Sequence, residues 1–120
     1  IHGRRTTCPV NGDTRLWLGS VKSVITNFIK AHELAQADSL PTYRAFNSPG
    51  ITLSIHEMVD ALERAGSDAS LIDWKLDPAI DAIVSSWPSA VDVSPELGLG
   101  FARDTDFMEV IDNYRTWYLQ

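Results

Sequence analysis

Arg15 and Trp17 are the two residues of this chain whose chemistry and spacing first suggest a binding site. In the stretch GDTRLWLGS, residues 12–20, side chains alternate as in a half-buried strand, with Arg15 and Trp17 on one side and Leu16 and Leu18 on the other. A guanidinium presents a planar fork of N–H donors that suits a carboxylate or a phosphate. Two interpretations follow from the residues alone. Either Arg15 binds an anion beside Trp17, or Arg15 pairs with a surface acid while Trp17 packs in the core.

Other motifs are too incomplete to predict a catalytic, cofactor or metal site. The sequence GLGFAR, residues 98–103, begins like a dinucleotide-binding fingerprint, but Arg103 stands at the third glycine position and no strand precedes it, so we predict a turn. The sequence HEMVD, residues 56–60, contains His, Glu and Asp at helical spacing. Because only two other histidines occur, we interpret it as an exposed helix face and expect no metal site.

No reactive side chain has the neighbours that catalysis requires. Cys8 is the only cysteine, so it cannot form an internal disulfide, and no base is predicted beside it. A short-chain dehydrogenase needs a tyrosine followed four residues later by a lysine, and no tyrosine here has one. We therefore expect no catalytic or cofactor-binding residues within this chain.

Composition limits the class of protein and its partners. The chain has 120 residues and a formal net charge of −6; residues 1–30 carry five cations and one acid, a balance of +4, and the remainder five cations and fifteen acids, a balance of −10. A mainly acidic chain is a poor nucleic-acid binder. No apolar run approaches the length of a membrane span, and one cysteine needs no oxidising compartment, so we expect a soluble, cytoplasmic protein without membrane contact.

Apolar spacing and capping residues predict four helices. The first follows Ser20 and has an apolar stripe through Val21, Val24, Ile25 and Phe28, and the second follows Ser54, where SIHE forms a capping box. The third follows Asp77 and begins with Pro78. The fourth follows Thr105 and has an aromatic stripe through Trp117 and Tyr118, which we interpret as core. Strands are predicted at 14–18, 43–46 and 71–74, the first two as a parallel pair. The stretch from 85 to 100 is predicted to be loop. These elements predict a small α/β fold, close to an α+β lobe, with short, mostly parallel strands.

The order of three segments resembles a known enzyme family. A CPV…DTR.W stretch begins at Cys8, a PG…T..EM..AL stretch follows at 49–62, and a DP…IV..WP stretch covers 77–88. In this order they resemble the C-terminal part of the NAD-dependent epimerase/dehydratase family, the extended short-chain dehydrogenases. The resemblance covers residues 8–119.

The resemblance implies that residues 1–120 form a single substrate-binding lobe, a fragment whose Rossmann domain lies outside this sequence. That domain would bind NAD(P) and perform hydride transfer on a small anionic sugar acid. In related sugar-nucleotide epimerases the arginine of the matching strand contacts the anionic part of the substrate, so the resemblance assigns substrate binding to Arg15, with Trp17 beside it. We expect such a lobe to expose an apolar docking face. The same face could form the interface of a homodimer.

Two alternatives stay open beside this hypothesis. The chain can be a stand-alone binding or interaction domain without catalytic activity, or part of a nucleotide-sugar epimerase. The sequence does not decide the exact substrate, the choice between NAD and NADP, the oligomeric state, or whether the chain is a complete gene product.

Overall fold

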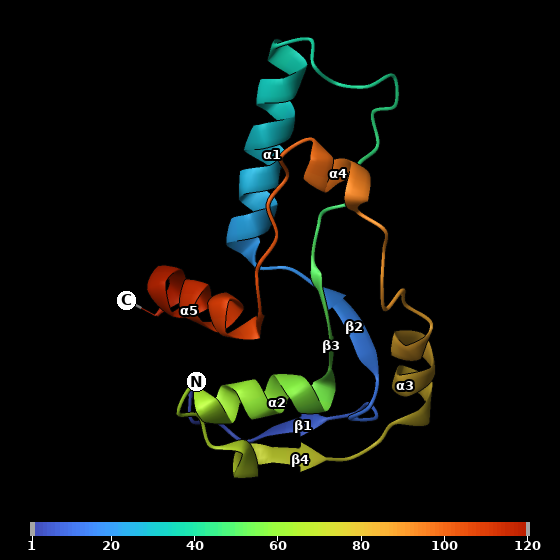
Figure 1. Ribbon diagram of the computed structural model, residues 1–120. Coiled ribbons are helices and arrows are strands. Elements are labelled where there is room, and N and C mark those ends of the chain that lie inside the picture. Colours follow the sequence, from blue (N-terminus) through green and yellow to red (C-terminus); the bar gives the residue numbers. More distant parts are fainter. Residues whose placement is uncertain (1, 120) are drawn as a thin grey trace. The chain divides into compact units, whose positions relative to one another are not determined.

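The computed structural model describes residues 2–119, which divide into two compact units (Figure 1). The first unit consists of the residues up to Trp17 together with Thr52–Ala90, and the second of Leu18–Ile51 together with the residues from Val91 onward. The elements in chain order are β1 (Thr6–Cys8), β2 (Arg15–Leu18), α1 (Val21–Gln36), β3 (Ile51–Ser54), α2 (Ile55–Arg64), a 3-10 turn (Ala69–Leu71), β4 (Ile72–Trp74), α3 (Pro78–Ser85), α4 (Ser94–Gly98) and α5 (Phe107–Tyr118).

Short strand pairs organise the first unit. β1 and β4 are parallel, with Thr6 opposite Ile72 and Cys8 opposite Trp74, while β2 pairs with β3. An exposed ion pair, 2.6 Å between the Arg5 guanidinium and Asp73, spans the first of these ladders. The predicted fold class, a small α/β fold with short parallel strands that alternate with helices, is therefore confirmed.

A capping box fixes the start of α2 directly after β3. The Ser54 hydroxyl accepts from the Glu57 N–H at 3.1 Å, and the Glu57 carboxylate accepts from the Ser54 N–H at 2.7 Å. This backbone hydrogen bond is the main reason why the pKa of Glu57 lies below its ordinary value of 4.5. The box predicted from the sequence SIHE is confirmed, and it joins β3 to α2 without a loop.

The second unit is held by polar contacts on one side of α1. Asp104 is fully buried, and its carboxylate accepts from the Ser20 N–H and the Ser20 hydroxyl, both at 2.7 Å, and from the Ser23 hydroxyl at 2.9 Å. One turn further along, the Asn27 amide exchanges two hydrogen bonds with the backbone of Ala102, at 2.8 and 2.7 Å. The segment around residues 102–104 is thereby fastened to the helix.

The contacts on one side of α1 leave its predicted apolar stripe exposed, and part of the predicted α5 stripe is exposed as well. Ser23 and Asn27 are buried in α1, whereas Val21, Ile25 and Phe28 are 53%, 52% and 73% exposed. Our expectation that the aromatic stripe of α5 is core was also wrong for its second half, because Trp117 and Tyr118 are exposed. α1 therefore buries the side that makes hydrogen bonds with buried groups, and most of its apolar side stays in contact with solvent.

Other elements differ from the sequence prediction for identifiable reasons. Residues 43–46 are not a strand, and their predicted pairing with β2 is wrong: the rings of Tyr43, Phe46 and Phe101 pack in sequence at 5.4 Å, and β3 takes the place beside β2. Three short elements were missed, β1, β3 and α4, the last of them inside the predicted loop. The last helix is capped by Asp106 and not by Thr105, whose N–H and hydroxyl instead bind the Glu109 carboxylate.

Replacing Asp104 by Asn should destabilise the chain strongly. An amide presents N–H donors to hydroxyl and N–H donors of α1, so at least one buried group loses its acceptor. We expect the free energy of unfolding to fall by about 2–3 kcal/mol, measured by urea denaturation with circular dichroism. The matched control is Asp60→Asn on the exposed side of α2, which should change it by less than about 0.5 kcal/mol. Equal effects of the two variants would contradict this account of α1.

The depressed pKa of Glu57 predicts a pH-dependent contribution to stability. Because the carboxylate form is favoured in the folded state, its contribution is present above the ordinary pKa of 4.5 and is lost as pH falls through the lowered folded-state pKa. The stability difference between the parent protein and Glu57→Gln should therefore shrink between pH 6 and pH 3 in urea titrations. Glu63→Gln controls for the loss of one charge on α2. A Glu57→Gln difference of equal size at both pH values would refute the coupling.

Candidate functional site

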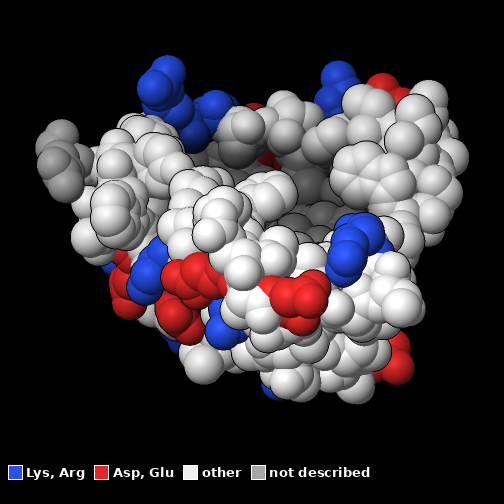
Figure 2. Space-filling model, turned by 90° about the horizontal axis from the view of Figure 1, so that it is seen from above, with Lys and Arg blue, Asp and Glu red and all other residues white. Residues whose placement is uncertain are grey.

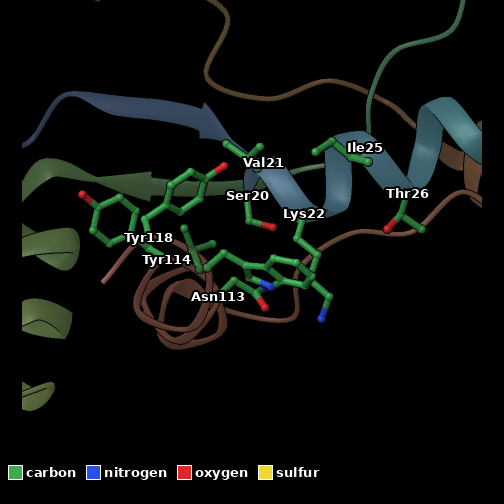
Figure 3. A pocket seen from close by; sticks show the side chains of 11 residues that line it. Ser20, Val21, Lys22, Ile25, Thr26, Asn113, Tyr114 and Tyr118 are labelled. Carbon is green, nitrogen blue, oxygen red and sulfur yellow. The ribbon is translucent and has the colours of Figure 1, made fainter. Parts of the chain in front are cut away.

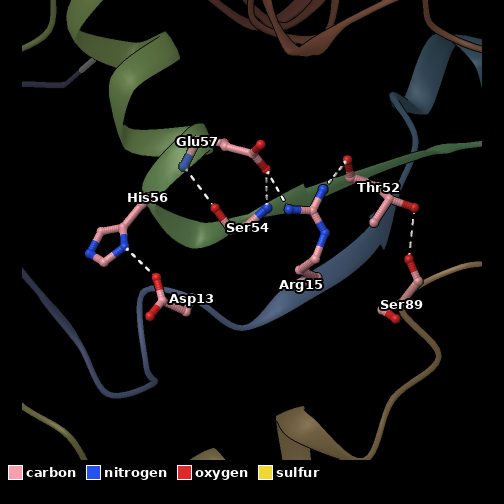
Figure 4. A network of polar contacts seen from close by, with 7 residues as sticks. All are labelled: Asp13, Arg15, Thr52, Ser54, His56, Glu57 and Ser89. Atoms are coloured by element: carbon pink, nitrogen blue, oxygen red, sulfur yellow. Dashed lines mark hydrogen bonds and ion pairs between the residues drawn. The ribbon is translucent and has the colours of Figure 1, made fainter.

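Arg15 lies at the start of β2, with its guanidinium fixed by two neighbours (Figure 4). Nη1 is 3.1 Å from the Glu57 carboxylate, and Nη2 donates to the Thr52 carbonyl of β3 at 3.2 Å. Glu57 thus serves both the helix cap and the arginine. The arginine side chain stays 47% exposed, so it is held in place while remaining open to a ligand from solvent.

The guanidinium retains hydrogen-bonding capacity beyond these contacts. Arginine has five N–H donors, and one N–H to Glu57 with one to Thr52 leaves three. A bidentate anion can therefore approach the fork without displacing both neighbours. The pair with Glu57 also bears out one half of the competing interpretation, that Arg15 contacts a surface acid.

Trp17 lies two residues further along β2 and is partly buried, in neither the core nor the fully exposed surface. Alternation along a strand places Arg15 and Trp17 on the same side. β2 therefore brings together the two residues that the sequence singled out, and their role in substrate binding stays a prediction.

His56, in the first turn of α2, contacts an acidic residue that lies just before β2. His56 Nδ1 is 3.2 Å from the Asp13 carboxylate, and the His56 ring packs against Trp74 with ring centres 5.0 Å apart. This explains the HEMVD motif: His56 and Glu57 have separate partners and do not converge. Within residues 2–119, no cluster of three or more His, Cys, Asp or Glu side chains is arranged to hold a metal ion.

The sequence GLGFAR forms the end of α4 and the turn after it. Gly98 is the last residue of α4, Gly100 has φ +87°, and the Phe101 side chain is buried. The positive φ explains the glycine at position 100. The prediction of a turn is confirmed.

A groove in the second unit was not predicted as a site. It has a volume of about 550 Å³ and lies between the N-terminal half of α1 and the last turns of α5 (Figure 3). Apolar and aromatic side chains line most of it, among them Val21, Ile25, Tyr114, Trp117 and Tyr118. The signal was present in the apolar stripes of both helices, of which we interpreted only the aromatic stripe of α5 as core.

Charged side chains of both signs lie on the face of the protein that Figure 2 shows. On the face in Figure 2, basic and acidic residues are interspersed among a majority of uncharged ones. In the described part of the chain, no helix combines the length and the apolar character needed to span a membrane.

Comparison of sequences identifies relatives of known activity. No protein-family model matches the chain. The chain is 37% identical over 118 residues to the D-erythronate dehydrogenase of Haemophilus influenzae and 33% identical over 116 residues to that of Cupriavidus necator. Each match covers 95% of this chain and 36% of the relative, so the chain spans about a third of the length of these relatives.

Solved structures share the fold. A nucleoside-diphosphate-sugar epimerase from Agrobacterium tumefaciens has a TM-score of 0.88 at 21% identity, over 98% of this chain and 34% of that protein. An L-threonine dehydrogenase from Phytophthora infestans has a TM-score of 0.75 at 21% identity, over 93% of this chain and 35% of that protein. In sequence the chain is similar to about a third of two D-erythronate dehydrogenases, and in fold it is similar to about a third of a nucleoside-diphosphate-sugar epimerase and of an L-threonine dehydrogenase, which confirms the predicted resemblance to the NAD-dependent epimerase/dehydratase family, D-erythronate dehydrogenase included.

Proposed function

We propose that this chain is the substrate-binding part of an NAD(P)-dependent sugar-acid dehydrogenase. The observation that carries the proposal is its similarity, over 95% of its length, to two D-erythronate dehydrogenases. Erythronate is a four-carbon hydroxy acid, so its binding requires a group that neutralises a carboxylate. Arg15 is the residue of this chain that we assign to that task.

The geometry around Arg15 supports this assignment. The contacts with Glu57 and the Thr52 carbonyl hold the guanidinium before a ligand arrives, which reduces the entropy lost on binding. Glu57 also offsets the arginine's positive charge, so a bound carboxylate must compete with it. Partial shielding by Trp17 would lower the competition from water and strengthen the charge-assisted pair.

Oxidation of a secondary alcohol also requires a hydride acceptor and a base, and we place both outside this chain. NAD(P), bound by an N-terminal nucleotide-binding domain, would accept the hydride. The residues described here contribute the orientation of the substrate: Arg15 at the carboxylate fixes which carbon of the hydroxy acid faces the cofactor. Residues 1–120 would then act as one lobe of a larger enzyme.

A sugar-nucleotide epimerase is the second candidate. Its support is the TM-score of 0.88 with the epimerase from Agrobacterium tumefaciens. In that case the same arginine would bind a phosphate of the nucleotide. The sequence relatives favour the sugar acid, because their identity of 33–37% exceeds the 21% of the epimerase.

Arg15→Ala in the full-length protein tests the assignment. Loss of a charge-assisted hydrogen bond of about 1.5–3 kcal/mol should raise KM for D-erythronate by roughly tenfold to a hundredfold, with a much smaller effect on kcat. Initial rates of NADH formation at varied D-erythronate concentrations measure both constants. An unchanged KM would refute the role of Arg15.

Two further variants separate substrate binding from structural damage. Arg5→Ala removes an arginine from another exposed ion pair of the first unit and should leave KM unchanged. Glu57→Gln removes the same ion pair as Arg15→Ala while keeping the cation, so it should raise KM far less than Arg15→Ala does, because only the fixing of the guanidinium is weakened. A rise in KM with Glu57→Gln equal to that with Arg15→Ala would show that only the ion pair matters.

A further inference from the structure

The Arg15 site combines one positive and one negative side chain. The guanidinium is positive, and the Glu57 carboxylate lies 3.1 Å from Nη1 (Figure 4). The pKa of Glu57 lies below 4.5, mainly because of the hydrogen bond from the Ser54 N–H and further because of the charge of Arg15, so the carboxylate is ionised at neutral pH. Asp13, the other acid in Figure 4, contacts His56. An anion that binds the guanidinium must therefore approach Glu57.

The charge of a ligand decides how well it tolerates this arrangement. A carboxylate carries one negative charge, whereas a phosphate ester carries nearly two at neutral pH. For each added charge, repulsion by Glu57 offsets much of the attraction to Arg15, while the cost of removing the ligand from water grows. The first unit as a whole contains eight Asp and Glu against five Lys and Arg, a balance of −3, which adds to the repulsion. The charges around Arg15 therefore favour a singly charged ligand.

The hydrogen-bond donors around the guanidinium lead to the same preference. A carboxylate has two oxygens, which the fork of a guanidinium binds together, whereas a phosphate ester presents three strong acceptor oxygens. Two neighbouring donors are already used: the Thr52 hydroxyl donates to the Ser89 carbonyl at 2.7 Å, and the Ser54 N–H donates to Glu57 at 2.7 Å. The third oxygen of a phosphate therefore gains no hydrogen bond from these two groups.

We propose that Glu57 is a specificity-determining residue, which makes the Arg15 site selective for a singly charged carboxylate over a doubly charged phosphate ester. This rests on the proposed function, in which Arg15 binds the anionic group of the substrate. It narrows the substrate class to unphosphorylated sugar acids, and it disfavours sugar phosphates and nucleotide sugars. The capping box of α2 keeps the Glu57 carboxylate in place beside the arginine.

Two ligands of similar shape and different charge test Glu57 in the full-length protein. Glycerol 3-phosphate is doubly charged at about pH 8, and glycerol 3-sulfate is singly charged. Both are measured as competitors of D-erythronate by displacement calorimetry in the presence of NAD. The parent protein should bind the sulfate ester more tightly, and this comparison requires no variant to fold. Glu57→Gln, whose amide oxygen can still accept from the Ser54 N–H, should raise the affinity for the phosphate ester relative to the sulfate ester by about threefold to tenfold.

Two control variants separate the charge of Glu57 from other effects of substitution. Glu57→Asp keeps the negative charge at this position. Glu63→Gln removes a charge from an exposed position of the same helix. Each should change the ratio of the two affinities by less than about twofold, since distant exposed charges are screened by salt.

The outcomes distinguish this proposal from the proposed function. Tighter binding of the phosphate ester by the parent protein would overturn the role of Glu57, and so would an equal change of the ratio in Glu57→Gln and Glu63→Gln. Saturable binding of D-erythronate with a ratio unchanged by Glu57→Gln would refute the role of Glu57 alone. Absence of saturable D-erythronate binding would refute the proposed function and, with it, the selectivity assigned to Glu57.

Discussion

The buried carboxylate of Asp104 is the constraint on which the second unit depends. It is fully buried and accepts three hydrogen bonds from the first turn of α1. A buried charge is costly unless its oxygens are satisfied, so the polar side of the helix must face it. The Ser20 hydroxyl, which donates to Asp104, also accepts from the Ser23 N–H, so the cap and the orientation of α1 are fixed together.

This orientation determines which surfaces are available for function. With Ser23 and Asn27 inside, the apolar residues of α1 are left at the surface beside the aromatic residues of α5. In the first unit, one carboxylate has two partners. Glu57 accepts from the Ser54 N–H at the start of α2 and also pairs with the Arg15 guanidinium, which it holds in place. Each unit therefore positions one feature, a fixed guanidinium in the first and an apolar groove in the second.

Local signals in the sequence predicted the helix starts well. Ser20, Ser54 and Asp77 each cap a helix because capping depends on a few adjacent residues. Strand pairing depends on distant residues, which is why 43–46 was mistaken for a strand and β3 was missed. The family resemblance supplied the fold, and alternation along β2 placed Arg15 beside Trp17.

The side of a helix that is buried was the harder property to predict. Apolar periodicity identified the stripes of α1 and α5 correctly, but the aromatic stripe of α5 was interpreted as core and its second half is exposed. Two facts override periodicity here: an acid distant in sequence, Asp104, holds the polar side of α1, and the described core is small, with Pro49, Val93, Phe101 and Ile111 as its buried apolar side chains in the second unit. Neither fact is visible in the spacing of residues along one helix.

Substrate binding is tested most directly by calorimetric titration of the full-length protein with a four-carbon sugar acid in the presence of NAD. If the Arg15 guanidinium binds the carboxylate of the sugar acid while the cofactor is bound elsewhere in the protein, the titration should show saturable binding. Arg15→Ala should weaken this binding strongly, and Arg5→Ala should affect it little. Absence of saturable heat, or equal affinity of the parent protein and Arg15→Ala, would contradict it.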